Sequence, residues 1–84
     1  MARVMFIEKD DHELRGLHKT EVSCKYIVSE YDGHKVLQLN SYGSMDRQIP
    51  GKLSQTFQFD ETVARQLWDL LEREFAFSAK PGNE

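Results

Sequence analysis

Two stretches of alternating apolar and polar residues flank the pair Asp32-Gly33. They read EVSCKYIVSEY and HKVLQLNSY, and both are rich in the β-branched and aromatic residues that favour strands. Asp-Gly favours a two-residue type I′ turn, because both turn positions need positive φ. We therefore predict a β-hairpin in which Tyr31 faces His34, which also pairs Val28 with Leu37, Tyr26 with Leu39 and Cys24 with Ser41.

A third run, LSQTFQF, continues the alternation from Leu53 to Phe59 and predicts a further strand of the same kind. Alternation gives each strand two faces. One face of the predicted sheet is mostly apolar and carries Cys24, Tyr26, Val28, Leu37, Leu39, Phe57 and Phe59. The other carries Ser23, Lys25, Ile27, Gln38, Asn40, Tyr42, Ser54, Thr56 and Gln58.

After Phe59 the apolar residues no longer recur at every second position. Asp60 is a good N-cap, and the apolar residues that follow recur at helical spacing. They predict a helix that runs to about Phe75 and packs on the apolar face of the sheet, through Val63, Leu67, Leu70, Leu71 and Phe75.

Residues 3–18 have less regular patterns than the rest of the chain. RVMFIE, residues 3–8, reads as a strand. In the next stretch Asp10 or Asp11 could cap a short helix over 10–18 that carries Leu14 and Leu17, although Gly16 disfavours it.

These elements predict an α+β fold: a four-stranded, mostly antiparallel sheet with the C-terminal helix on one face. A short helix after the first strand is left open. With 84 residues the chain has room for one domain, which we place at 1–77. The ending SAKPGNE predicts a flexible tail over 78–84.

The small size bears on assembly. A chain of this length builds a small core, and such domains often gain stability by associating. We expect a homodimer through the helix and the neighbouring sheet edge, with Leu67, Trp68 and Leu71 at the interface. Cys24 is the single cysteine, and no apolar run is long enough to span a bilayer, so a cytoplasmic protein without membrane contact is expected.

Several chemistries are disfavoured. The loop GSMDRQIPGKLS departs from the phosphate-binding P-loop, which needs a glycine where Asp46 stands and Ser or Thr where Leu53 stands. The three histidines and Cys24 lack the close pairs of a zinc site. With neither a nucleophile-base pair nor a metal pattern visible, we expect no enzymatic activity, metal or cofactor.

The net charge of −3 argues against a protein whose whole surface binds nucleic acid, but the segment from Ser41 to Gln58 carries two bases and one acid. Its cations adjoin the polar sheet face. Aromatic rings that stack on bases and cations that follow phosphates are what single-stranded nucleic acid needs. The candidate residues are Lys25, Gln38, Asn40, Tyr42 and Thr56 on the face, with Arg47 and Lys52 on the loop. The alternative is a solvated outer face, which antiparallel sheets commonly have.

The second half of the chain, GHKVLQLNSYGSMDRQIPGKLSQTFQFDETVARQLWDLLE, resembles the transcriptional coactivator positive cofactor four family. Tyr42, Pro50-Gly51-Lys52, the strand from Leu53 to Phe59 and Trp68 follow one another as in that family. The resemblance implies a homodimer that binds single-stranded DNA on its curved sheet, with Tyr42 and Lys52 near the DNA and a role in transcription regulation. This chain departs from the family pattern at Leu53, where a basic residue usually follows the PGK lysine, and in its acidic balance.

A second function class is also open. Exposed aromatic residues often anchor protein interfaces, and Tyr31, Trp68 and Phe77 are candidates. Together with the acidic balance they are compatible with a small regulatory or phage-type accessory protein that works by docking on a protein partner.

Overall fold

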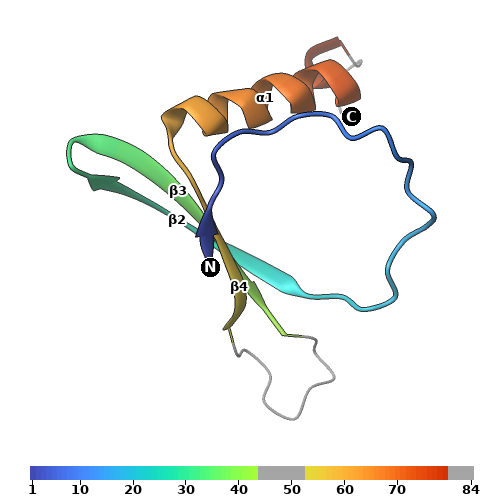
Figure 1. Cartoon of the computed structure of the whole chain (residues 1–84), viewed down its shortest axis with the longest axis horizontal. Coiled ribbons are helices and arrows are strands. Elements are labelled where there is room, and N and C mark those ends of the chain that lie inside the picture. Colours follow the sequence, from blue (N-terminus) through green and yellow to red (C-terminus); the bar gives the residue numbers. More distant parts are fainter. Residues whose placement is uncertain (44–52, 80–84) are drawn as a thin grey trace.

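The structure is a computed structural model in which residues 1–43 and 53–79 are described. Figure 1 shows a twisted sheet whose last strand leads directly into a helix. The elements are β1 (Ala2–Arg3), β2 (Ser23–Tyr31), β3 (His34–Tyr42), β4 (Leu53–Phe59), the helix α1 (Glu61–Phe75) and the 3-10 turn η1 (Phe77–Ala79).

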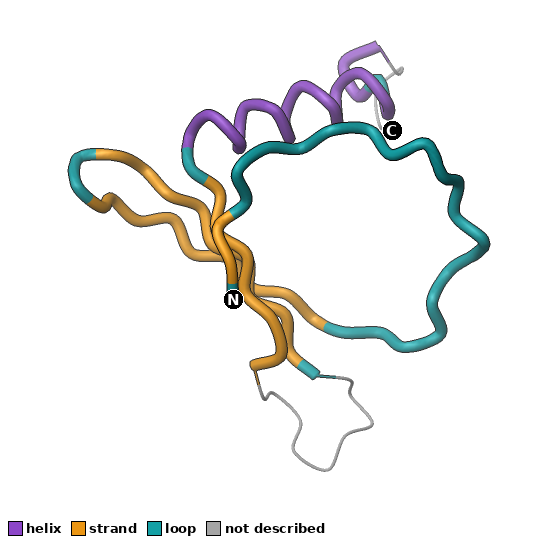
Figure 2. Tube along the Cα trace, in the orientation of Figure 1, coloured by secondary structure: helices purple, strands orange, loops and turns teal. Residues whose placement is uncertain are grey.

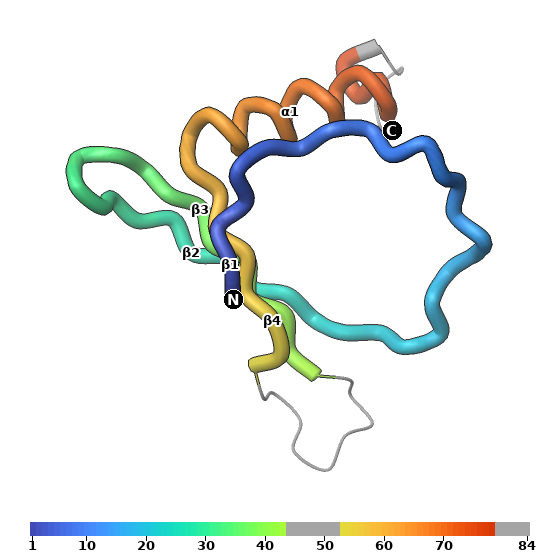
Figure 3. The backbone as a smooth tube through the Cα atoms, in the orientation of Figure 1, coloured from blue at the N-terminus to red at the C-terminus, as the bar shows by residue number. Residues whose placement is uncertain are grey.

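The four strands lie in the order β1-β4-β3-β2. The β2–β3 and β3–β4 pairs are antiparallel, whereas β1 pairs with β4 in parallel, through Ala2–Phe57 and Arg3–Gln58. The predicted α+β class and four-stranded sheet are confirmed, with the refinement that the sheet is mixed. In Figure 3 the first residues of the chain lie beside β4, although they are far from it in sequence.

The hairpin has the predicted register. Tyr31 pairs with His34, and Val28 pairs with Leu37. Asp32 has φ 55° and Gly33 has φ 78°, the pair of positive values that a type I′ turn requires. The turn residues therefore fix which side chains share a face along the whole hairpin.

The β3–β4 ladder contains a β-bulge at the end next to the β3–β4 connection. Ser41 pairs with Gln55 and Tyr42 pairs with Leu53, so Ser54 is the extra residue. The hydroxyl of Ser41 accepts a hydrogen bond from the backbone N–H of Gln55 at 3.2 Å. Bulges increase local twist and re-aim side chains, and this one lies beside Tyr42.

The helix begins and ends with identifiable caps. The carboxylate of Asp60 accepts a hydrogen bond from the N–H of Val63 at 3.0 Å, as predicted for the N-cap. At the other end Ala76 adopts the left-handed conformation, with φ 52°, and its N–H donates to the carbonyl of Glu72. Beyond it, Ser78 lies in η1, and its hydroxyl donates to the Glu72 carboxylate at 3.0 Å.

One prediction about the N-terminal part is wrong, and the short helix left open there is absent. The strand expected over 3–8 ends at Arg3, although the Val4 N–H still donates to the carbonyl of Gln58. No helix forms over 10–18: the chain there is an extended connection that arcs away from the sheet (Figure 2). Leu14 and Leu17 are 89% and 94% exposed, so a short helix would bury no apolar face and would be marginal by itself.

The core is small. Among the described residues the buried apolar side chains are Phe59 and Val63, at the junction between β4 and α1. Tyr26, Val28 and Phe57 on the apolar sheet face remain exposed. The helix therefore covers one end of the sheet, and much of the apolar face is open.

Candidate nucleic-acid interface

The polar face of the sheet brings together five of the seven residues predicted to bind nucleic acid. Lys25 on β2 pairs with Asn40 on β3, and Asn40 pairs with Thr56 on β4. Paired residues point to the same side of a sheet. Gln38 and Tyr42 belong to the same face, because they lie two residues before and after Asn40 on β3. Arg47 and Lys52 lie outside the described residues.

A ladder of side-chain hydrogen bonds crosses this face. Gln58 Nε2 donates to Gln38 Oε1 at 2.8 Å, and Gln38 Nε2 donates to Asn40 Oδ1 at 2.9 Å. Thr56 Oγ1 donates to the same Asn40 oxygen at 3.1 Å. Asn40 and Thr56 are 8% and 5% exposed, and such buried polar groups need partners. We call these four residues the amide ladder.

The amide ladder changes the role expected of two site residues. Asn40 Oδ1 already accepts two hydrogen bonds, and the Thr56 hydroxyl is used as a donor. Both side chains therefore hold the sheet face together, which leaves the more exposed members, Gln38 and Gln58, for contact with a ligand. Gln58 was not among the predicted site residues, although its alternation with Thr56 placed it on this face.

Lys25 and Tyr42 form the end of the face nearest the β3–β4 connection. Lys25 Nζ lies 5.5 Å from the centroid of the Tyr42 ring, within the range of a cation–π contact. Tyr42 is the last residue of β3, and the chain re-enters the sheet at Leu53. The chain therefore leaves and re-enters the sheet at this end of the face.

Arg3 adds a cation at the opposite edge. It pairs in parallel with Gln58, which puts its side chain on the polar face, and it is exposed. Sequence reasoning missed Arg3 because the parallel β1–β4 pairing joins residues that are far apart in the chain. The face thus carries a base at each edge, with uncharged amides and hydroxyls between them.

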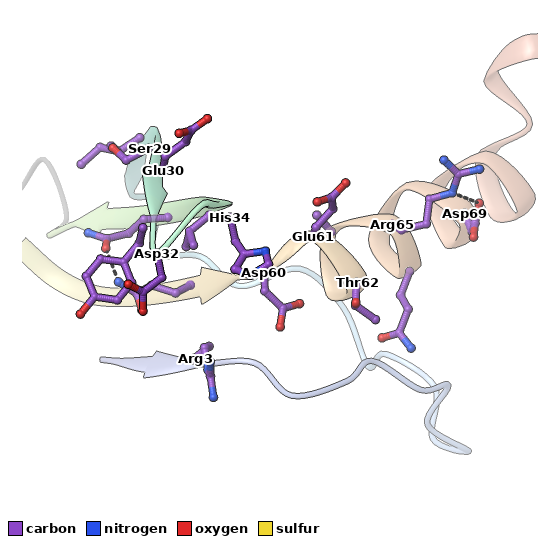
Figure 4. Close-up of a pocket in the computed structure, with 17 residues that line it drawn as sticks. Arg3, Ser29, Glu30, Asp32, His34, Asp60, Glu61, Thr62, Arg65 and Asp69 are labelled. Carbon is purple, nitrogen blue, oxygen red and sulfur yellow. Dashed lines mark hydrogen bonds and ion pairs between the residues drawn. The ribbon is translucent and has the colours of Figure 1, made fainter.

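A groove occupies the end of this same face away from Tyr42, between the β2–β3 hairpin and the first half of α1, and Arg3, Gln38 and Gln58 belong to its lining (Figure 4). Ile27, Val36 and Tyr31 supply its apolar lining. The arginines that line the groove are Arg3 and Arg65. Arg65 is already paired, because its Nε is 3.6 Å from Asp69 Oδ1. The carboxylates that line the groove are those of Glu30, Asp32, Asp60, Glu61 and Asp69. They outnumber the bases and would repel a phosphate chain at this end of the face, whereas the end with Lys25 and Tyr42 lies outside the groove lining.

The predicted dimer residues lie on α1. Leu67 and Leu71 are half-buried, and Trp68 is 59% exposed. The guanidinium carbon of Arg65 lies 4.8 Å from the centroid of the Trp68 ring. Of the other aromatic candidates, Tyr31 is exposed at the hairpin turn, and Phe77 stacks on Phe75 with ring centroids 5.3 Å apart.

The described residues contain no group of three or more His, Cys, Asp or Glu placed to hold a metal ion. His12 and Asp10 lie close together, with His12 Nδ1 2.6 Å from Asp10 Oδ1. The His12 backbone N–H, and after it the His12 ring, hold the pKa of the Asp10 carboxyl below its ordinary value. Cys24 is a free, exposed thiol. No helix in the described part of the chain is long and apolar enough to cross a membrane.

The comparisons with known proteins give no relative: no family model, curated protein or solved structure matches the chain. The fold and the polar face define a small α+β protein with one amphipathic sheet. Its function is therefore argued from the site alone.

Proposed function

We propose that this protein is a non-enzymatic binding protein that holds single-stranded nucleic acid across the polar sheet face, and that it acts as a homodimer. The observation that carries the proposal is the composition of that face. Lys25 and the Tyr42 ring lie together at the end of the face outside the groove, and Arg3 lies at the β1 edge, within the groove lining. No carboxylate side chain belongs to this face on β2, β3 or β4.

The chemistry of each part suits a flexible, single-stranded ligand. Lys25 attracts phosphates at the Tyr42 end, Arg3 is a second cation at the β1 edge, and the ring offers a surface on which a base can stack. The amide ladder fixes the spacing of Gln38 and Gln58, whose amides can donate and accept hydrogen bonds. Arg47 and Lys52, expected from the sequence to contact phosphates, would add to the end of the face at Tyr42. With few cations, binding should be weak and show little sequence preference.

The test is a fluorescence-anisotropy titration with labelled oligo-dT at two salt concentrations. Binding should weaken with salt, with a logarithmic slope of about 0.7 for each phosphate contacted. Tyr42→Ala should cost about 1–3 kcal/mol of binding free energy, whereas Tyr42→Phe should retain most of the affinity. Arg3→Ala and Lys25→Ala should each weaken binding and reduce the salt slope.

Lys35→Ala is the matched control, because Lys35 pairs with Glu30 on the opposite face of the same hairpin. It removes the same charge from the protein without touching the polar face. No anisotropy change at high micromolar protein and low salt would refute the proposal. Equal effects of Lys35→Ala and Lys25→Ala would also refute it, since they would show a response to net charge alone.

The groove supports a second candidate function, docking on a protein partner as a small regulatory or phage-type accessory protein. Its excess of carboxylates and its apolar lining, with Tyr31 exposed at the rim, suit a basic protein surface. A pull-down from nuclease-treated lysate tests this class. A stoichiometric protein that is lost with Tyr31→Ala and Glu61→Lys together would support docking, and an empty bait would count against it.

We also place the protein in the cytoplasm. Cys24 is a free and exposed thiol, which is more typical of a reducing compartment than of an oxidising one.

A further inference from the structure

Strand β2 is a free edge of the sheet. In the described part of the chain it pairs with β3 alone, and all nine of its residues are exposed. Tyr26 is 72% exposed, Val28 53% and Ile27 47%. A long edge strand with apolar side chains on both faces and no proline is a template for pairing with another strand.

The hairpin geometry shows which backbone groups that edge offers. Tyr31 and His34 flank the two-residue turn and therefore form a hydrogen-bonded pair. In an antiparallel ladder such pairs alternate with non-hydrogen-bonded ones. The odd-numbered residues of β2 thus bond to β3, and the backbone N–H and C=O groups of Cys24, Tyr26, Val28 and Glu30 point outward.

The accessible surface of the chain is larger than that of a typical folded monomer of its mass. A folded monomer of 9.8 kDa has an accessible surface of roughly 5,200 Å². The whole chain exposes 7964 Å², an excess of about 2,800 Å² to which the extended connection before β2 contributes as well as the open sheet. A standard interface buries roughly 800 Å² from each partner, which is well within that excess.

We propose that the occupant of this edge is β2 of a second copy, paired antiparallel about a two-fold axis at Ile27. This inference rests on the homodimer of the proposed function and assigns its contact to β2 rather than to α1 alone. Two copies of one strand make a self-complementary contact, as a two-fold axis requires. Centring it on Ile27, the middle residue of Ser23–Tyr31, pairs the whole strand.

This register also brings compatible side chains opposite each other and pairs the outward backbone groups of the two strands. Tyr26 faces the partner's Val28, an aromatic and β-branched pair, and both residues present their backbone groups outward. Lys25 faces the partner's Ser29, so the two lysines are not opposite each other. The two sheets then join into one of eight strands, and the polar face continues across the axis with a Lys25 and Tyr42 from each copy.

Cysteine cross-linking tests the register. In a Cys24→Ser background, Ile27→Cys puts two thiols at a non-hydrogen-bonded pair, where Cα atoms are about 4.5 Å apart and a disulfide can form. Ser29→Cys is the matched control, because the two positions would be about 14 Å apart. We expect Ile27→Cys to give a disulfide dimer under mild oxidation and Ser29→Cys to give none. A mixture of Lys25→Cys and Ser29→Cys chains should cross-link.

Val28→Pro tests the edge itself. It removes an outward N–H that β3 does not use, whereas Val28→Thr keeps that N–H and the branched side chain. In sedimentation equilibrium the parent chain and Val28→Thr should have twice the mass of 9.8 kDa, and folded Val28→Pro should have the monomer mass. If Val28→Pro does not fold, the cross-linking decides.

These experiments distinguish a failure of the β2 contact from a failure of the proposed function. A dimer in which Ile27→Cys fails to cross-link, or in which Ser29→Cys cross-links equally, overturns the β2 contact and leaves the homodimer. A parent chain that is monomeric at tens of micromolar overturns both, and leaves the edge free for a strand from another protein. Neither result touches oligo-dT binding, which the anisotropy titration measures separately.

Discussion

Removing the centre of the amide ladder should destabilise the fold. Asn40→Ala deletes the oxygen that accepts from Gln38 and Thr56. The Gln38 amide is partly exposed and can turn to water, so its loss is small. The Thr56 hydroxyl is 5% exposed and would be left without its acceptor, at a cost of about 1–3 kcal/mol. When the net contribution of the lost hydrogen bonds is added, we expect Asn40→Ala to lower the free energy of unfolding by about 2–3 kcal/mol.

A double-mutant cycle isolates the pair. Thr56→Val replaces the hydroxyl by a methyl group and should cost about 1 kcal/mol, because Asn40 keeps its bond from Gln38. In the double variant no buried hydroxyl is stranded, so the two losses should not add. We expect a coupling of about 1 kcal/mol, measured by urea denaturation at one fixed protein concentration with circular dichroism.

Gln58→Ala is the control for this cycle. Gln58 is an exposed member of the ladder, so its loss should change the free energy of unfolding by less than about 0.5 kcal/mol. Additive effects of Asn40→Ala and Thr56→Val would refute the reasoning. They would mean that the hydroxyl finds another partner or that the face is more open to water than its burial indicates.

Three further outcomes are expected. Gly33→Val should lower the free energy of unfolding by about 1–2 kcal/mol, because φ is 78° there; an unchanged urea midpoint would contradict the type I′ turn. Asp60→Ala should cost about 1 kcal/mol by removing the N-cap bond to Val63, and Asp60→Asn should recover most of it in the same assay. In an NMR titration Asp10 should ionise at lower pH than in an unstructured peptide, and His12→Ala should raise its pKa. Because the folded pKa is the lower one, any stability from this group is present above the unfolded pKa and lost as pH falls through the folded pKa.

The sequence was most informative where structure is local. The Asp32-Gly33 turn determines the hairpin register within a few residues, and Asp60 determines the start of the helix through a bond to Val63. Both predictions are confirmed. The alternation of Lys25, Gln38, Asn40, Tyr42 and Thr56 likewise placed them on one face.

The sequence was less informative where structure depends on distant contacts. The parallel pairing of Arg3 with Gln58 leaves no local pattern, so the strand was expected to be longer and Arg3 was missed. The groove depends on how the helix is placed against the hairpin, which periodicity does not report. The helix left open over 10–18 had a candidate N-cap and two spaced leucines but no surface to pack on, and tertiary context outweighs such local signals.

The shortness of β1 has a consequence for the order of folding. The β2–β3 hairpin closes a two-residue turn and β4 adds the next strand, so these elements can form early. β1 joins through two residue pairs and closes a loop that spans most of the chain, which is entropically costly. It should therefore dock last and be the first strand to open in hydrogen exchange. Since Arg3 belongs to β1, a ligand that holds Arg3 would slow that opening, and the exchange rate of the Val4 amide, which bonds to Gln58, would report occupancy of the polar face from the far edge of the sheet.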